Sequence, residues 1–169
     1  MVRPMTDREP RTGEITLPFD PAKTADDGAV VFIGRIRSPW KTREDCPRNM
    51  EQARERGQTA SMEIDDVWRP GLDGLQRSTH AVVLYWMQEA RRDLIVQCPR
   101  RRVEPAGVFA LRSPARPNPI ALATVRILSI DQEAGRITID AIDCLDGTPL
   151  LDIKPWSDSI EGIAVQQSG

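Results

Sequence analysis

Apolar and polar positions alternate with a period of two along several stretches of the chain, whereas the helical period is poorly represented. The run 79–87 is apolar on both faces and predicts a buried strand, and 93–98 could pair as a further one. The remaining predicted strands cover residues 29–38, 59–64, 120–130, 136–145 and 149–155. This series of short strands predicts a mainly β fold, with an antiparallel sheet that closes or forms a sandwich, long irregular loops and little helix.

The segments between the predicted strands are either long connections or short turns. Residues 39–58 form a long charged connection, and residues 69–78, with one proline and two glycines, leave room for at most one helical turn. Ala134-Gly135 and Asp146-Gly147 are turn signals between late strands. The late part of the chain is therefore predicted to consist of hairpins.

The length of 169 residues suits one domain with tails. We expect an N-terminal arm over residues 1–28, a folded domain over 29–160 and a C-terminal tail over 161–169. No apolar run reaches the ~18 residues that a membrane-spanning helix needs, and the N-terminus lacks the apolar core of a signal peptide. These features predict a cytoplasmic protein.

Charge is unevenly distributed along a chain whose net charge is only −2. Seven arginines lie between Arg91 and Arg116 against two acidic residues, while the chain from Ser129 onward carries eight acidic residues against two basic ones. A basic strip of this kind attracts phosphates. The alternative is that these arginines are only the solvent-exposed side chains of a loop.

Several common chemistries are excluded by the residues present. His80 is the only histidine and opens a buried strand, so we expect a hydrogen-bonded structural role for it and no Ser-His-Asp or Cys-His catalysis. Cys46, Cys98 and Cys144 are odd in number and scattered, which indicates reduced thiols and no zinc site. Neither a G-x-G-x-x-G nor a P-loop motif is present, so no glycine-rich nucleotide site is predicted.

The stretch "RSPARPNPIA", residues 112–121, is the first candidate for a functional site. Ser113, Arg116 and Asn118 each precede a proline, so the stretch cannot be helical. If it is extended, Arg112, Arg116 and Asn118 share a face; if it is polyproline II, Arg112 aligns with Asn118. A rigid connector and a rigid presenter of polar groups to a ligand are both compatible with this pattern.

The second candidate is "DAIDCLDGTPLLDIKPW", residues 140–156. Asp143 and Asp146 flank the predicted end of a strand, and Asp152 lies on the return strand. Asp-Gly-Thr-Pro is a good turn sequence that the Asp146 side chain can cap. A hairpin with exposed acidic residues, a ligand site and a magnesium site all fit this spacing.

Together these segments resemble the YaeB/TsaA-like family, of the tRNA methyltransferase O type. The resemblance rests on "VFIGRIRSPWK" (31–41), "CPR" (46–48), "GVFALRSPARPNPIALATVRIL" (107–128) and "DCLDGTPLLDIKPW" (143–156). It implies a small closed antiparallel β-barrel over 29–160, a homodimer, and S-adenosylmethionine as cofactor. The resemblance further implies methylation of N6 of threonylcarbamoyladenosine 37 in tRNA, with the anticodon loop as partner.

Carried over by position, the resemblance implies a set of site residues. Cofactor contacts fall on Arg48, Asn49, Met50, Met87, Gln88, Arg112, Leu122, Asp143, Cys144, Leu145 and Asp146. Arg116, Asn118 and Lys154 belong to the same motifs and are candidates for RNA contact. No catalytic residue is implied, and no metal.

The sequence departs from the family pattern at a few positions. Asn49-Met50-Glu51 stands where Gln-Pro-Gly is usual, Met87 where histidine is usual, and Ala121 and Trp156 replace a glycine and a tyrosine. The alternative function is therefore a cofactor-binding barrel with a different substrate or with a regulatory, non-enzymatic role.

Overall fold

The computed structural model describes residues 9–24, 28–99 and 104–162. The chain divides into two compact units, the smaller formed by residues 1–31 and 86–121 and the larger by 32–85 and 122–169. Parts of the predicted N-terminal arm and C-terminal tail, and the arginines at 100–102, lie outside the described residues. Among the described residues, no helix combines the length and apolar character needed to cross a bilayer.

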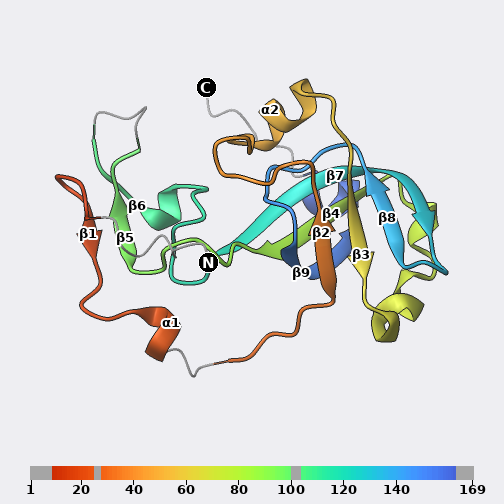
Figure 1. Ribbon diagram of the computed structural model, residues 1–169, viewed down its shortest axis with the longest axis horizontal. Coiled ribbons are helices and arrows are strands. Elements are labelled where there is room, and N and C mark those ends of the chain that lie inside the picture. The colour runs from red at the N-terminus through yellow and green to blue at the C-terminus, as the bar shows by residue number, and fades with distance from the viewer. Residues whose placement is uncertain (1–8, 25–27, 100–103, 163–169) are drawn as a thin grey trace. The chain divides into compact units, whose positions relative to one another are not determined.

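Six strands of the larger unit follow one another in a ring-like sheet, in the order β2-β3-β8-β7-β4-β9 (Figure 1). Their bounds are β2 Gly34–Arg37, β3 Ala60–Ile64, β4 His80–Trp86, β7 Ile120–Asp131, β8 Arg136–Ile139 and β9 Thr148–Pro155. The pairs β2–β3, β2–β9, β3–β8, β4–β9 and β7–β8 are antiparallel. The prediction of a mainly β fold is confirmed, and each of these strands lies within a run that the sequence predicted, to within one residue at its ends.

Alternation along the strands places the core inside this sheet. In β2, Gly34 and Ile36 are buried while Arg35 and Arg37 are exposed. Ile36, Met62, Val83, Val125, Ile137, Ile139 and Leu150 are fully buried. Gly34 has no room for a side chain, because a Cβ there would lie 1.9 Å from the backbone carbonyl oxygen of Glu63. The close approach of β2 to β3 therefore requires a glycine.

Helix α2, Met50–Glu55, lies within the connection 39–58, where no helix was predicted (Figure 1). Its N-cap Asn49 accepts a hydrogen bond from the Gln52 backbone N–H at 2.8 Å, and Gln52 Oε1 accepts one from the Arg48 N–H at 2.8 Å. This reciprocal capping satisfies backbone donors that a helix start leaves free. Two 3₁₀ helices, Asp66–Leu72 and Leu75–Arg77, and the short helix α3, Asp158–Glu161, complete the larger unit.

The smaller unit contains a three-stranded sheet in the order β1-β5-β6. Its strands are β1 Ile15–Thr16, β5 Leu94–Gln97 and β6 Ala106–Gly107, and it also holds helix α1, Pro21–Thr24, and the 3₁₀ helix Val108–Ala110. β5 pairs antiparallel with β1 and with β6. The possibility that residues 93–98 pair as a strand is thus confirmed.

Candidate functional site

Residues 140–147, which we call the acidic loop, connect β8 to β9 in the larger unit and are held by the segment that follows β2. Ser38 Oγ donates to the carbonyl of Cys144 at 2.8 Å, and Trp40 Nε1 donates to the carbonyl of Ile142 at 2.8 Å. The Asp146 backbone N–H donates to the carbonyl of Trp40 at 2.8 Å. Since Ser38 and Trp40 are buried, these bonds fix the loop in one conformation.

Asp146 uses both of its carboxylate oxygens inside the protein. Oδ1 accepts from the Ser38 backbone N–H at 3.1 Å, and Oδ2 pairs with Lys41 Nζ at 2.8 Å and lies 4.0 Å from the Arg37 guanidinium. The hydrogen bond from Lys41, aided by that from Ser38, holds the pKa of Asp146 below its usual range. The Asp146 side chain therefore braces the acidic loop.

Asp143 is held differently, by two neutral donors. Tyr85 Oη, from β4, donates to Asp143 Oδ1 at 2.7 Å, and Cys46 Sγ donates to the Asp143 carbonyl at 3.4 Å. Burial raises the pKa of Cys46 to about 11, and burial followed by the Asp143 charge raises the pKa of Tyr85. Both donors therefore keep their protons at neutral pH. No other described residue donates to the Asp143 carboxylate, so Oδ2 is available to a ligand.

The predicted contacts at Cys144 and Leu145 lie between these two aspartates. The Cys144 side chain is fully buried, and burial raises its pKa. The carbonyl of Leu145 accepts from Thr148 Oγ1 at 2.7 Å. These two residues shape the acidic loop through their backbone.

The structure places α2 in the same unit as the acidic loop, and the last turn of the helix contacts the first residue of that loop. Arg54 on α2 donates to the carbonyl of Thr124 at 2.7 Å and pairs with Asp140 Oδ2 at 3.4 Å. Asp140 Oδ1 accepts from the Arg126 N–H at 2.8 Å, which anchors the first residue of the loop to β7. Of the predicted cofactor residues at the helix start, Arg48 and Asn49 are exposed and Met50 is half-buried. The Asn49 side chain is engaged as the helix cap.

The proline stretch 112–121 belongs to the smaller unit and is non-helical, as predicted. Its carbonyls are tied by neighbouring donors: Arg92 Nε donates to Pro117, Gln97 Nε2 to Ala115, and the Met87 N–H to Pro119. The Arg92 guanidinium also reaches Asn118 Oδ1 at 3.3 Å and lies 5.4 Å from the centre of the Trp86 ring. The backbone of the stretch is thereby fixed, which suits both a connector and a presenter.

The two arginines of this stretch differ in what they contact. Arg116 donates to the carbonyl of Val108 at 3.1 Å, so its guanidinium is used within the unit. Arg112 is exposed and makes no hydrogen bond or ion pair with any residue that the structure describes. Arg112 is therefore the cation that the rigid stretch offers to solvent or to a ligand.

A model of the tRNA-methyltransferase O N-terminal domain matches residues 35–161, three quarters of the chain. The chain belongs to this family. It is 41% identical over 129 residues to the probable S-adenosyl-L-methionine-binding protein VirR of Rhizobium radiobacter, covering 76% of this chain and 71% of that one. An S-adenosyl-L-methionine-binding protein of Archaeoglobus fulgidus is also 41% identical over 129 residues, covering 76% of this chain and 89% of that one.

Solved structures of the family agree with this assignment. The crystal structure of TrmO from Pseudomonas aeruginosa is 29% identical with a TM-score of 0.64, covering 84% of this chain. A second TrmO crystal structure is 30% identical with a TM-score of 0.66, also over 84% of this chain. The chain spans 62% and 63% of the length of these two TrmO chains.

The remaining predicted residues of this TrmO-family chain lie on strand surfaces or next to a strand end. Gln88, just after β4, is exposed, and Leu122 on β7 is 47% exposed. Lys154 on β9 pairs with Asp152 at 2.6 Å, which raises the pKa of the lysine. His80 is exposed, and its Nδ1 lies 3.0 Å from Thr79 Oγ1, so the expectation of a hydrogen-bonded histidine is met.

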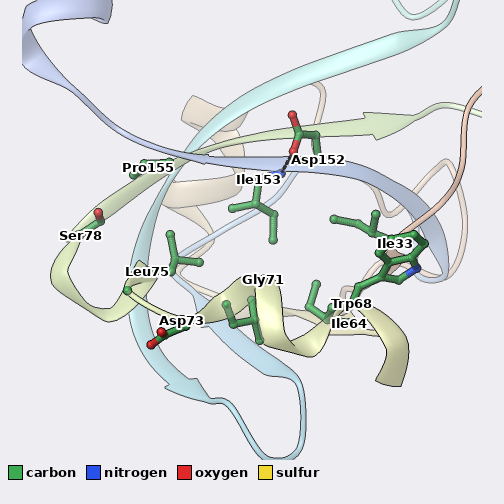
Figure 2. A pocket seen from close by; sticks show the side chains of 12 residues that line it. Ile33, Ile64, Trp68, Gly71, Asp73, Leu75, Ser78, Asp152, Ile153 and Pro155 are labelled. Carbon is green, nitrogen blue, oxygen red and sulfur yellow. Dashed lines mark hydrogen bonds between the residues drawn. The ribbon is translucent and has the colours of Figure 1, made fainter.

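An open hollow of about 500 Å³ in the larger unit involves none of the predicted cofactor residues (Figure 2). It is lined mainly by the two 3₁₀ helices and β9, and Figure 2 shows Ile153 of β9 pointing into it. Among the described residues, no group of three or more histidine, cysteine, aspartate or glutamate side chains could hold a metal ion.

Sequence reasoning missed the residues that hold the acidic loop: Ser38, Trp40, Cys46 and Tyr85. A signal was present for Tyr85, which is the only tyrosine of the chain and lies in an otherwise apolar run. A buried tyrosine hydroxyl needs a hydrogen-bond partner, and Asp143 supplies it. Ser38 and Trp40 belong to a motif that was recognised, but nothing in the spacing indicated what they contact.

Proposed function

We propose that the chain is an S-adenosylmethionine-binding methyltransferase domain whose cofactor lies against the acidic loop and the start of α2. The observation that carries this proposal is the family match over residues 35–161, which contains both segments. Oδ2 of Asp143, which no described residue hydrogen-bonds, supports it, because a carboxylate suits the amino group, the ribose hydroxyls or the sulfonium of this cofactor. Arg48, Asn49, Met50 and, through their backbone, the loop residues Cys144, Leu145 and Asp146 complete the proposed contacts in the larger unit.

Four further cofactor contacts are proposed from the family resemblance alone. They are Met87, Gln88, Arg112 and Leu122, as the sequence predicted. The exposed guanidinium of Arg112 fits the cofactor's carboxylate, and Leu122 fits an apolar wall. The cofactor, when bound, supplies an activated methyl group, so the task of the protein is to hold donor and acceptor in line.

The proposed acceptor is N6 of threonylcarbamoyladenosine 37 in the anticodon loop of a tRNA. Its carbamoyl group makes N6 more acidic than that of plain adenine, so a strong general base is not required, and we assign none. The base must leave the anticodon stack to reach the cofactor, and basic side chains on phosphates would hold the loop. Arg116, Asn118 and Lys154 remain proposed RNA contacts.

Three further properties follow from the same proposal. The ring of six strands is proposed to be a closed antiparallel barrel within a domain over 29–160. The family resemblance favours a homodimer. A tRNA substrate implies a cytoplasmic location.

A second candidate function is a cofactor-binding domain with another substrate or a regulatory role. It is favoured by the relatives whose names state only S-adenosylmethionine binding, and by Asn49, Met50 and Met87, which depart from the family pattern. Both functions share the cofactor and differ in the acceptor.

The test begins with calorimetry of S-adenosylmethionine binding to the whole chain. Binding is expected, and Arg112→Ala is expected to weaken it about tenfold or more, since a charge-assisted hydrogen bond is removed. Arg77→Ala, another exposed arginine without a side-chain partner in the described structure, is the matched control. No binding at millimolar cofactor would refute the proposal.

A methylation assay then separates the two functions. The substrate is tRNA that carries threonylcarbamoyladenosine but lacks the methyl group. Methyl transfer to it supports the tRNA methyltransferase, and cofactor binding without transfer favours the second candidate.

A further inference from the structure

The two aspartates of the acidic loop differ in how many of their carboxylate oxygens are already bound within the protein. Both oxygens of Asp146 are engaged, one by a backbone N–H and the other by Lys41 and Arg37. Asp143 has one oxygen engaged, by Tyr85, and one that forms no hydrogen bond or ion pair with a described residue. Of the two side chains, only that of Asp143 can take a ligand without breaking contacts that hold the loop.

Tyr85 is placed to decide where the Asp143 carboxylate points. It lies within β4, is 3% exposed, and the only hydrogen bond of its hydroxyl to a described residue is that to Asp143 Oδ1, at 2.7 Å. β4 pairs with β9, with a register irregularity between Leu84 and Tyr85, so the backbone of Tyr85 belongs to the sheet and not to the loop. A rigid donor therefore fixes one carboxylate oxygen, which also fixes the direction of the other.

The backbone of Asp143 is restrained from a second direction. Cys46 Sγ donates to its carbonyl, and Cys46 comes from the connection between β2 and α2. Because burial keeps both the thiol and the phenol protonated at neutral pH, neither donor is lost by ionisation. Side chain and main chain of Asp143 are held by two segments that are remote in sequence.

Resting on the proposed function, we infer that Tyr85 is a positioning residue for cofactor binding: its hydroxyl orients the Asp143 carboxylate so that the second oxygen meets the cofactor. The arrangement is preorganised, because the orientation is set before the ligand arrives. Tyr85 itself contacts no ligand in this scheme.

The test is a double-mutant cycle on the dissociation constants of S-adenosylmethionine and S-adenosylhomocysteine, measured by calorimetry with the whole chain. Tyr85→Phe removes only the hydroxyl and is expected to weaken binding about tenfold. Asp143→Ala is expected to weaken it at least as much. In the Asp143→Ala background, Tyr85→Phe is expected to change nothing further, because the group it orients is gone.

A purely structural role of Tyr85 predicts the opposite result, namely that the two losses multiply in the double variant. Multiplying losses, or wild-type affinity in Tyr85→Phe, would overturn the inference. Thr138→Val removes a hydroxyl from β8 that has no hydrogen-bond partner among the described residues, so it is the matched control and is expected to bind like the wild type. Circular dichroism and thermal unfolding confirm that each variant is folded.

Failure of the inference is separable from failure of the proposed function. If the wild-type chain binds neither compound, the proposed function fails and the inference with it. If the wild type binds and the cycle shows independent losses, only the role of Tyr85 is refuted.

Discussion

Replacing Ser38 by alanine tests whether the acidic loop is held by the segment after β2. The Ser38 hydroxyl donates to the carbonyl of Cys144 at 2.8 Å and accepts from the Trp40 N–H at 3.2 Å, in a buried position. Its removal leaves a buried acceptor and a buried donor unpaired, each at a cost of about 1–3 kcal/mol. We expect a total loss of about 3 kcal/mol in the free energy of unfolding, a large share of the 5–15 kcal/mol typical of a domain.

Urea unfolding followed by circular dichroism measures this loss directly, and a thermal scan should show Tm lowered by about 10 °C. Ser129→Ala, at an exposed position of β7 without a side-chain hydrogen bond in the described structure, is the matched control and should change stability by less than about 0.5 kcal/mol. A loss for Ser38→Ala as small as that of the control would refute the argument, because it would mean that the loop is not held by these bonds.

Two further predictions concern close packing and charge. Gly34→Ala should lower the free energy of unfolding by about 3 kcal/mol or more, because the added Cβ would overlap a backbone carbonyl of β3. Gly71→Ala is the control: a Cβ at Gly71 meets no atom within 4 Å, so this variant should be tolerated in the same urea experiment. The pKa of Asp146 is lowered in the folded state from its ordinary value of 3.8, so its ion pair with Lys41 stabilises the fold above that pH and is lost as the pH falls below it. When the pH is lowered from about 6 to about 3, Asp146→Asn should therefore lose less stability than the wild type does. The control Asp73→Asn should lose as much stability as the wild type. Equal losses in the wild type and both variants would contradict the role of Asp146.

The sequence predicted a strand well where apolar and polar residues alternate along the strand in step with their burial. The run 59–64 was predicted as a strand, and β3 covers Ala60–Ile64 with alternating burial. The run 136–145 was predicted to be one strand, but β8 ends at Ile139. Beyond that point the carbonyls of Ile142 and Cys144 turn to Trp40 and Ser38 instead of continuing the ladder. Such a switch of partners depends on a segment about a hundred residues away, which local periodicity does not reveal.

Helix α2 was missed for a related reason. Its six residues have no apolar stripe, and only Ala53 is buried, so the helical period is too weak to detect. The local signal that did exist was the cap, Asn49 followed three residues later by Gln52. Arg54, which ties the helix to Asp140 and to the carbonyl of Thr124, supplies tertiary support that propensity cannot predict.

The acidic loop shows why residue type alone does not assign a role within a recognised motif. Asp143 and Asp146 are chemically identical and three positions apart, and the family resemblance implied that both contact the cofactor. Asp146 meets a lysine, an arginine and a backbone N–H, which neutralise its charge and occupy both oxygens. Asp143 meets a phenol and a thiol, which orient it, and it forms no ion pair with a residue that the structure describes. An oriented carboxylate without an ion pair suits a cationic or hydroxyl-bearing ligand, so the neighbouring residues distinguish Asp146, which braces the loop, from Asp143, which is proposed to bind.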